Sequence, residues 1–189
     1  MIEFKIVYYL NHLGQGTFLD VITKFVSSSD SLILLWIALA LISLIFDKRN
    51  GKLIFLGSLL IIIIYLVLND LIIKQGILEH IFYRQRPYIS NPTQIFPLGD
   101  LWKDSSFPSG HMANTLAFIT FYIYFYRKYW TYILGIVLAF LMAFSRMHNG
   151  MHYPSDVFVG SLFGIGYGFL VVYVINKIRS KIQKSPEKF

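Results

Sequence analysis

Long runs of apolar residues alternate with short polar segments along most of this 189-residue chain. A helix that crosses the hydrocarbon core of a bilayer needs about 20 residues, and fewer where polar ends extend it. Tyr and Trp residues gather near several ends of the runs, as in an aromatic belt at the membrane interface. The pattern predicts an all-α, integral membrane bundle of about five transmembrane helices: Leu32–Phe46, Leu53–Ile73, Met112–Tyr126, Trp130–Phe144 and Val157–Ile175.

The first 30 residues have a different pattern, with scattered apolar positions at roughly helical spacing. This spacing predicts amphipathic helices that lie along the membrane interface. The segment lacks the basic start, apolar core and cleavage site of a signal peptide. Because no linker divides the chain, we expect one domain over residues 1–189, with interfacial helices at 1–30, a transmembrane core at 31–176 and a basic cytoplasmic tail at 177–189.

Composition supports a membrane protein, since 56% of the residues are hydrophobic and 14% are charged, against roughly 25% charged residues in soluble domains. The chain has no cysteine, which excludes disulfides and thiolate metal sites. The net charge of +7 fits the basic flanks of membrane helices, and no basic face of a soluble fold indicates a nucleic-acid partner. Nothing in the sequence indicates an obligatory protein partner.

The basic residues are divided unevenly between the two sides of the predicted bundle. Ten of the 17 Lys and Arg residues fall in two short loops and the tail on one side, and seven fall on the other. By the positive-inside tendency the richer side is cytoplasmic. We therefore expect a multi-pass protein of the plasma (inner) membrane, with segments 74–111 and 145–156 on the periplasmic or extracellular side.

Three polar clusters interrupt the apolar pattern: EHIFYRQRPY at 79–88, FPSGHMAN at 107–114 and SRMHNGMHYPSD at 145–156. They follow the second and fourth predicted spans or lead into the third and fifth. Alternating spans bring these four points to the same membrane face. Polar and ionisable groups are costly near a bilayer and usually functional, so we expect one assembled site.

The residue types in these clusters are those that bind phosphate. Guanidinium groups, here Arg84, Arg86 and Arg146, form paired hydrogen bonds with phosphate oxygens. Ser109 and Gly110 stand where a helix is predicted to begin, and exposed backbone N–H groups at such a position bind anions. Each feature alone is common in membrane proteins, and their joint location is what predicts a phosphate pocket.

The histidines suggest a reaction as well as binding. His152 and Asp156 are four residues apart, so one helical turn would stack them, and a carboxylate on one ring nitrogen leaves the other to attack phosphorus. His111 is placed to protonate a leaving oxygen.

The spacing of His148, His152 and Asp156 also suits a helical zinc site. The positive charge of Arg86 and Arg146 opposes this alternative, so no metal or other cofactor is expected. We expect His148 to shape or line the pocket.

These residues resemble the type 2 phosphatidic acid phosphatase superfamily. The pattern of that family is Lys, six residues, Arg-Pro; then Pro-Ser-Gly-His; then Ser-Arg, five residues, His, three residues, Asp. The second part matches 108–111 and the third matches 145–156 in full. The resemblance implies that His152 is the nucleophile that forms a phosphohistidine, that Asp156 orients it and that His111 is the general acid. It also implies that the phosphate oxygens are held by Arg86, Ser109, Gly110 and Arg146.

The first part of the pattern departs from the family at Glu79, where the family has Lys. A carboxylate cannot attract phosphate by charge. Either Arg84 or Lys74 supplies the missing cation, or Glu79 meets a polar or amine-bearing headgroup. Glu79, Arg84 and His148 are therefore candidate contacts with the rest of the substrate.

The resemblance and the sidedness together predict a metal-independent lipid phosphatase at the extracytoplasmic face. Its substrate would be a phospholipid or isoprenoid phosphate drawn from the bilayer, with undecaprenyl diphosphate as first choice and lipid A 1-phosphate or phosphatidylglycerophosphate as alternatives. A lipid phosphotransferase is a further alternative. A non-catalytic binder or transporter of lipid phosphates is an alternative of another class, although His152, Asp156 and His111 argue against it.

Overall fold

The computed structural model describes residues 2–67 and 79–184, and all regular secondary structure in these two ranges is helical, which confirms the all-α prediction. The helices are, in chain order, α1 (Ile2–His12), α2 (Phe18–Ser27), α3 (Ser29–Phe46), α4 (Gly51–Ile63), α5 (Glu79–Ile81), α6 (Pro87–Ser90), α7 (Gly110–Tyr126), α8 (Tyr129–His148) and α9 (Pro154–Lys184).

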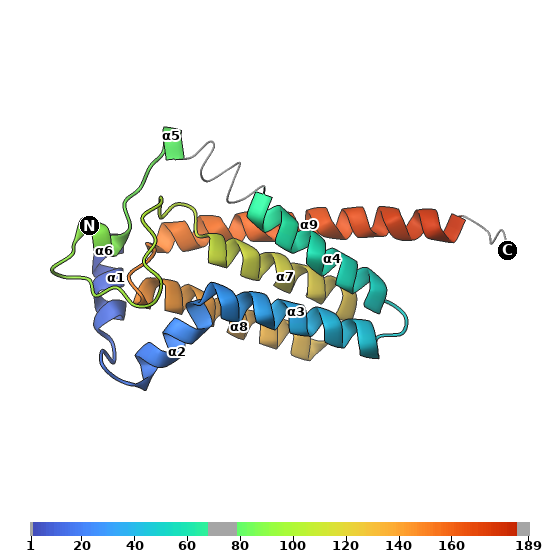
Figure 1. Cartoon of the computed structure of the whole chain (residues 1–189), viewed down its shortest axis with the longest axis horizontal. Helices are drawn as coiled ribbons and strands as arrows, with labels where there is room; N and C mark the ends of the chain where they lie inside the picture. The colour runs from blue at the N-terminus through green and yellow to red at the C-terminus, as the bar shows by residue number, and fades with distance from the viewer. Residues whose placement is uncertain (1, 68–78, 185–189) are drawn as a thin grey trace.

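The five predicted spans correspond to α3, α4, α7, α8 and α9, which pack as one bundle (Figure 1). The helices α1, α2 and α6 gather at the end of the bundle where α7 and α9 begin. At the opposite end, the C-terminal half of α9 extends past the other helices. The polar clusters of the sequence therefore lie at one end of the molecule.

Within the described residues, three helices are long and apolar enough to cross a membrane: Ser29–Phe46, Tyr129–His148 and Pro154–Gln183. The shorter apolar helix Gly51–Val67 includes a π-helical turn at 64–67 that extends α4. The predicted end of this span, up to Ile73, lies outside the described residues. The 17 residues of α7 also fall short of about 20, so the crossing of the membrane by α4 and α7 stays a prediction. The chain is a membrane protein.

The contact between α7 and α9 depends on glycines four residues apart along one face of α9. A Cβ atom at Gly160 would stand 2.4 Å from the carbonyl oxygen of Ser109, and one at Gly164 would stand 2.3 Å from that of Ala113. Small residues at this spacing allow helix backbones in membranes to approach closely. This approach fixes the first turns of α7 and α9 beside each other.

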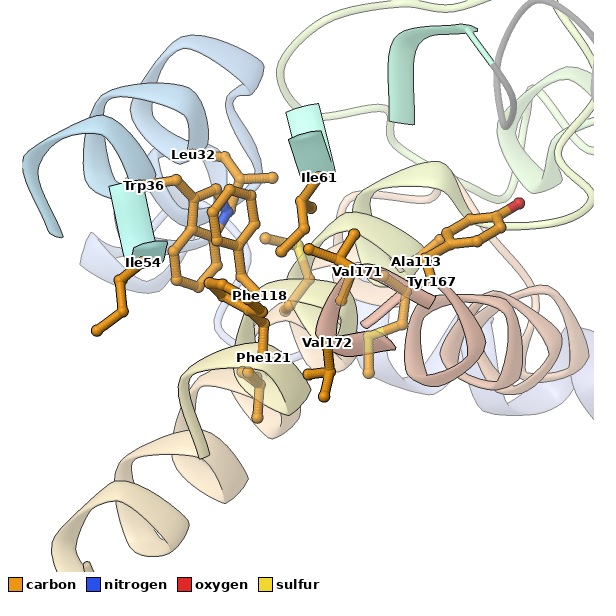
Figure 2. Close-up of a cluster of buried hydrophobic side chains, with 14 of the residues drawn as sticks. Leu32, Trp36, Ile54, Ile61, Ala113, Phe118, Phe121, Tyr167, Val171 and Val172 are labelled. Atoms are coloured by element: carbon orange, nitrogen blue, oxygen red, sulfur yellow. The ribbon is translucent and has the colours of Figure 1, made fainter. Parts of the chain in front are cut away.

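An aromatic stack joins α3 to α7 in the centre of the bundle. The rings of Trp36 and Phe118 are parallel, with centroids 4.3 Å apart, and Figure 2 shows them among buried aliphatic side chains of α4 and α9. Close by, α4 has Gly57, where a Cβ would stand 2.1 Å from the ring of Phe121. Packing of this density holds α7 in place.

The two N-terminal helices cover the end of the bundle. In α2 the buried residues are polar, namely Asp20, Thr23 and Ser27, whereas apolar residues such as Phe18 and Phe25 are exposed. This arrangement is the reverse of that in a helix of a water-soluble protein. It suits a helix with its polar side on the protein and its apolar side in lipid, as the predicted interfacial position requires.

Candidate active site

A cavity of about 210 Å³ lies at the end of the bundle where α7 and α9 begin and α8 ends. It receives side chains from all three polar clusters of the sequence. Its lining residues are Ser29, Tyr65, Arg86, Trp102, Lys103, Asp104, Gly110, His111, Arg146 and His152. Five residues with predicted roles are thus brought together around one cavity.

His152 lies in the short connection between α8 and α9 and is almost fully buried. Its Nδ1 is 2.7 Å from the carbonyl oxygen of Ser106. A carbonyl can only accept a hydrogen bond, so Nδ1 carries the proton. The other ring nitrogen, Nε2, is 3.4 Å from Nη1 of Arg86 and 3.3 Å from Nη2 of Arg146. The ring therefore presents an unprotonated Nε2 to two guanidinium groups.

Asp156 occupies a different position from the one that the spacing predicts. His152 precedes α9, which begins at Pro154, and the nearer carboxylate oxygen is 3.8 Å from Nδ1. That oxygen accepts a hydrogen bond of 2.9 Å from the backbone N–H of Tyr153. A side chain in the first turn that reaches back in this way caps the helix. The direct hydrogen bond that fixes the ring comes from the Ser106 carbonyl.

Arg86 immediately precedes Pro87, the first residue of α6, and is 2% exposed. Its Nη2 donates to Oδ1 of Asp104 at 2.7 Å and its Nε donates to the carbonyl oxygen of Asp104 at 3.2 Å. A buried charge needs such a partner and additional hydrogen bonds. Asp104 therefore holds one edge of the guanidinium, while Nη1 donates to the Met151 carbonyl oxygen at 3.3 Å and also faces His152.

Arg146 approaches His152 from the last turn of α8 and is also buried. Its Nη1 donates to Ser27 at the end of α2, to the hydroxyl at 2.5 Å and the carbonyl at 3.3 Å. Its Nε has no hydrogen-bond partner within the described ranges 2–67 and 79–184. Leaving a buried N–H without a hydrogen-bond acceptor costs free energy. A phosphate oxygen bound in the cavity would be a suitable acceptor for this Nε.

The first turn of α7 forms another wall of the cavity through Gly110 and His111. The Nε2 atom of His111 is 3.2 Å from the hydroxyl of Ser29, the first residue of α3. Ser109 lies behind this wall: its side chain is buried, and its N–H donates to the carbonyl oxygen of Asp156. The start of a helix carries partial positive charge, so this wall favours an anion.

Arg84 lies behind His152 instead of lining the cavity. Its Nη1 donates to Asp156 at 2.6 Å and its Nη2 donates to Glu3 at 2.6 Å. Its guanidinium carbon is 4.0 Å from the centroid of the Tyr153 ring. Burial opposes its charge, but the hydrogen bond to Glu3 and the negative charges of Asp156 and Glu3 outweigh burial and raise the pKa of Arg84. Arg84 therefore does not occupy the position expected of a residue that contacts the substrate.

His148 points away from the cavity, toward the N-terminal helices. Its Nδ1 is 3.1 Å from the hydroxyl of Thr23 and its Nε2 is 3.0 Å from the carbonyl oxygen of Leu13. Helix α8 ends at His148, and His152 follows in the connection to α9. The two histidines therefore do not share the helical face that the alternative zinc site requires, and His148 joins α8 to α1 and α2.

Several lining residues were missed by the sequence interpretation, among them Ser29, Tyr65, Lys103 and Asp104. Tyr65 lies in the π-helical turn that extends α4, and such turns often occur at functional sites. Lys103 and Asp104 are charged residues that shortly precede the Pro-Ser-Gly-His motif. Their closeness to this motif is the sequence feature that could have indicated a place in the site. Glu79 begins α5, but its side chain lies outside what the structure describes, as does the whole of Lys74.

Comparisons with known proteins agree with this arrangement. The sequence profile of the PAP2 superfamily matches residues 58–180. The chain is 33% identical to an undecaprenyl-diphosphatase of Sulfolobus acidocaldarius over 74% of this chain and 63% of that protein. It is 34% identical to a lipid A 4'-phosphatase of Bacteroides thetaiotaomicron over 41% of this chain and 34% of that protein. The chain thus spans less than two thirds of the length of these relatives.

The crystal structure of Aquifex aeolicus LpxE superposes on this structure with a TM-score of 0.65 and 27% sequence identity. The match covers 92% of this chain and 96% of that one. The two chains therefore share one fold over nearly their whole lengths. With a family profile matched over more than half of its length, the chain belongs to the PAP2 superfamily, the type 2 phosphatidic acid phosphatases that its motifs resemble.

Proposed function

We propose that the protein is a metal-independent lipid phosphatase that works through a phosphohistidine on His152. The observation that carries this proposal is the geometry of the ring, whose Nδ1 donates to the Ser106 carbonyl while Nε2 faces Arg86 and Arg146. A neutral imidazole held in one tautomer is a nucleophile at its unprotonated nitrogen. Two guanidinium groups beside that nitrogen are placed to bind the oxygens of the phosphate under attack.

In the first step, Nε2 of His152 forms a bond to phosphorus as the bond from phosphorus to the leaving oxygen breaks. His111 gives its proton to that oxygen, which leaves on the lipid. The ring of His152 keeps its Nδ1 proton and becomes cationic. The Ser106 carbonyl at 2.7 Å and the Asp156 carboxylate at 3.8 Å stabilise this charge.

In the second step, water attacks the phosphohistidine and gives a proton to His111. The bond between phosphorus and Nε2 breaks, inorganic phosphate leaves and His152 returns to its neutral form. The two steps together convert a lipid phosphate and water into a dephosphorylated lipid and phosphate. The residues named here supply acid, base and nucleophile, so the reaction needs no metal.

A second cavity supports a lipid as the carrier of the phosphate. It has a volume of about 480 Å³ and lies between α2, α3, α7 and α8, with Leu32, Trp36 and Leu138 among its lining residues. Thr115, which also lines it, donates to the carbonyl oxygen of His111 at 2.8 Å. An apolar cavity one helical turn from the candidate general acid suits the hydrocarbon part of a leaving group.

For the substrate, we propose undecaprenyl diphosphate, hydrolysed at the periplasmic or extracellular face of the plasma membrane. The relative from Sulfolobus acidocaldarius, an undecaprenyl-diphosphatase, matches 74% of this chain. The second candidate is a lipid A phosphate, favoured by the match to the lipid A 4'-phosphatase. The third candidate substrate is phosphatidylglycerophosphate.

The test is phosphate release by purified protein in detergent from undecaprenyl diphosphate, lipid A and phosphatidylglycerophosphate, with EDTA present. We expect the first lipid to give the highest kcat/KM and orthovanadate to inhibit. His152→Ala should remove turnover while thermal unfolding stays cooperative. Loss of wild-type activity in EDTA that zinc restores would refute the metal-free mechanism. Phosphate transfer to an added alcohol in place of water would identify a phosphotransferase, and binding without release would identify a non-catalytic protein.

A further inference from the structure

Glu3, near the start of the chain, belongs to the charged cluster behind the candidate nucleophile. Its Oε2 accepts a hydrogen bond of 2.6 Å from Arg84, and its Oε1 accepts one of 2.9 Å from the backbone N–H of Ser155. Burial alone would raise the pKa of Glu3, but the hydrogen bonds from Ser155 and Arg84 outweigh burial and lower it. Glu3 is therefore a carboxylate at neutral pH.

Arg84 connects Glu3 to the active site. The same guanidinium donates to Oδ1 of Asp156 at 2.6 Å and to the hydroxyl of Ser155 at 2.7 Å. The other oxygen of Asp156 is 3.8 Å from Nδ1 of His152. A continuous series of charged contacts thus runs from α1 through Arg84 and Asp156 to the ring.

The net charge of Glu3, Arg84 and Asp156 sets the electrostatic environment of the His152 ring. Two carboxylates and one guanidinium leave one net negative charge behind His152. Without Glu3, the charges of Arg84 and Asp156 would cancel. On the other side of the ring lie the cationic Arg86 and Arg146, with Asp104 paired to Arg86 and with Lys103 and His111 in the same cavity. The cluster is therefore the source of negative charge behind a ring that becomes cationic during the reaction.

We propose that Glu3 is a positioning residue for catalysis, which offsets the charge of Arg84 so that Asp156 remains available to stabilise cationic His152. This proposal rests on the phosphohistidine mechanism proposed above. Glu3 is not one of the lining residues of the cavity, and it hydrogen-bonds to Arg84 and Ser155, so we expect its effect to reach the reaction through Arg84 and Asp156. Its loss should lower kcat and leave KM close to the wild-type value.

The test compares kcat and KM for phosphate release by the wild-type chain and four variants. We expect Glu3→Gln to lower kcat about tenfold, because a charge lost at this range is only partly screened, and Glu3→Asp to stay near the wild type. Asp30→Asn is the matched control, since it removes an exposed carboxylate at the same end of the bundle and should leave kcat unchanged.

The decisive variant is the double substitution Glu3→Gln with Arg84→Gln. It removes one negative and one positive charge and so restores one net negative charge at Asp156. We expect its kcat to exceed that of Glu3→Gln, whereas a purely structural role for Glu3 predicts a further loss. Thermal unfolding shows whether each variant folds. If the double variant does not fold, the comparison of kcat between Glu3→Gln and Glu3→Asp tests the proposal instead.

Two outcomes separate this inference from the proposed function. If the wild type releases phosphate and Glu3→Gln matches its kcat, the inference is wrong and the proposed function stands. If the wild type releases phosphate from none of the lipids, the proposed function fails, and the role of Glu3 in it fails too.

Discussion

Gly160 lies so close to Ser109 that a methyl group on its Cα would stand 2.4 Å from the Ser109 carbonyl oxygen. Ser109 in turn donates its N–H to the carbonyl oxygen of Asp156. The close contact between α7 and α9 thus places Gly110 and His111 of one helix beside Asp156 of the other. The packing of α7 against α9 therefore also brings these parts of the candidate site together.

Gly160→Ala should therefore destabilise the bundle, since overpacking a close contact costs about 1–3 kcal/mol. The measurement is thermal unfolding in detergent micelles together with phosphate release. Gly166→Ala on the same helix is the control, because a Cβ there would meet no atom within 4 Å. Equal melting temperatures for the two variants would contradict the packing role of Gly160.

Asp156→Asn should lower kcat less than His152→Ala does. Where an aspartate alone fixes the tautomer of a catalytic histidine, its replacement by asparagine costs about 10⁴-fold. Here the Ser106 carbonyl holds the Nδ1 proton, so we expect a loss of about 10²-fold or less from the missing charge. Nitrogen NMR of labelled histidine reports the tautomer, and a change of tautomer in Asp156→Asn would disprove the role given to Ser106.

Lys103→Ala should raise KM several-fold and change kcat little. Lys103 lines the cavity in a chain that has Glu79 where the family has lysine, so it is the candidate for the missing cation. Lys5→Ala, which removes an exposed lysine elsewhere on the same end, should leave KM unchanged. Similar KM values for both variants would exclude Lys103 as a phosphate contact.

The contact between Glu3 and Arg84 should give stability that depends on pH. Because the pKa of Glu3 is lowered from its ordinary value of 4.5, the contribution is fully present above that pH and is lost as the pH falls through the lowered value. The melting temperatures of the wild type and of Glu3→Gln should differ at neutral pH and converge in acid. A difference that persists below both pKa values would have another cause.

His148→Gln should lower the melting temperature, because His148 is fully buried and bonded to Thr23 and Leu13. Leaving buried partners without hydrogen bonds costs about 1–3 kcal/mol for each group. The KM of the folded fraction should stay near the wild-type value, since His148 points away from the cavity. A large rise in KM with no change in melting temperature would place His148 in contact with the substrate.

Hydrophobic runs predict the helices of the bundle because membrane segments are long and their composition is distinct. The ends of the helices are harder to predict. The span expected at Val157 begins at Pro154, since the capping contact of Asp156 with Tyr153 extends α9 by a turn. The fixed spacing of the motifs is enough to predict that Arg86, His111, Arg146 and His152 meet in one site, and all four line the cavity.

Contacts made by backbone atoms and by distant segments have no comparable signal in the sequence. The partner of Nδ1 is a carbonyl oxygen, and every residue has one, so no residue type marks Ser106. Glu3 and Arg84 meet across 81 positions, and a short amphipathic segment at the N-terminus gives no sign of such a contact. Charge alone predicts Arg84 near the phosphate, whereas the carboxylates of Glu3 and Asp156 hold it elsewhere.

The two guanidinium groups that meet Nε2 of His152 also have a consequence for the resting protein. At 3.4 and 3.3 Å both guanidinium groups face the lone pair that the proposed reaction uses, so we expect a phosphate to meet the arginines and this nitrogen together. We therefore expect an electrophile without anionic oxygens to react slowly with His152, because it offers the two guanidinium groups no acceptor.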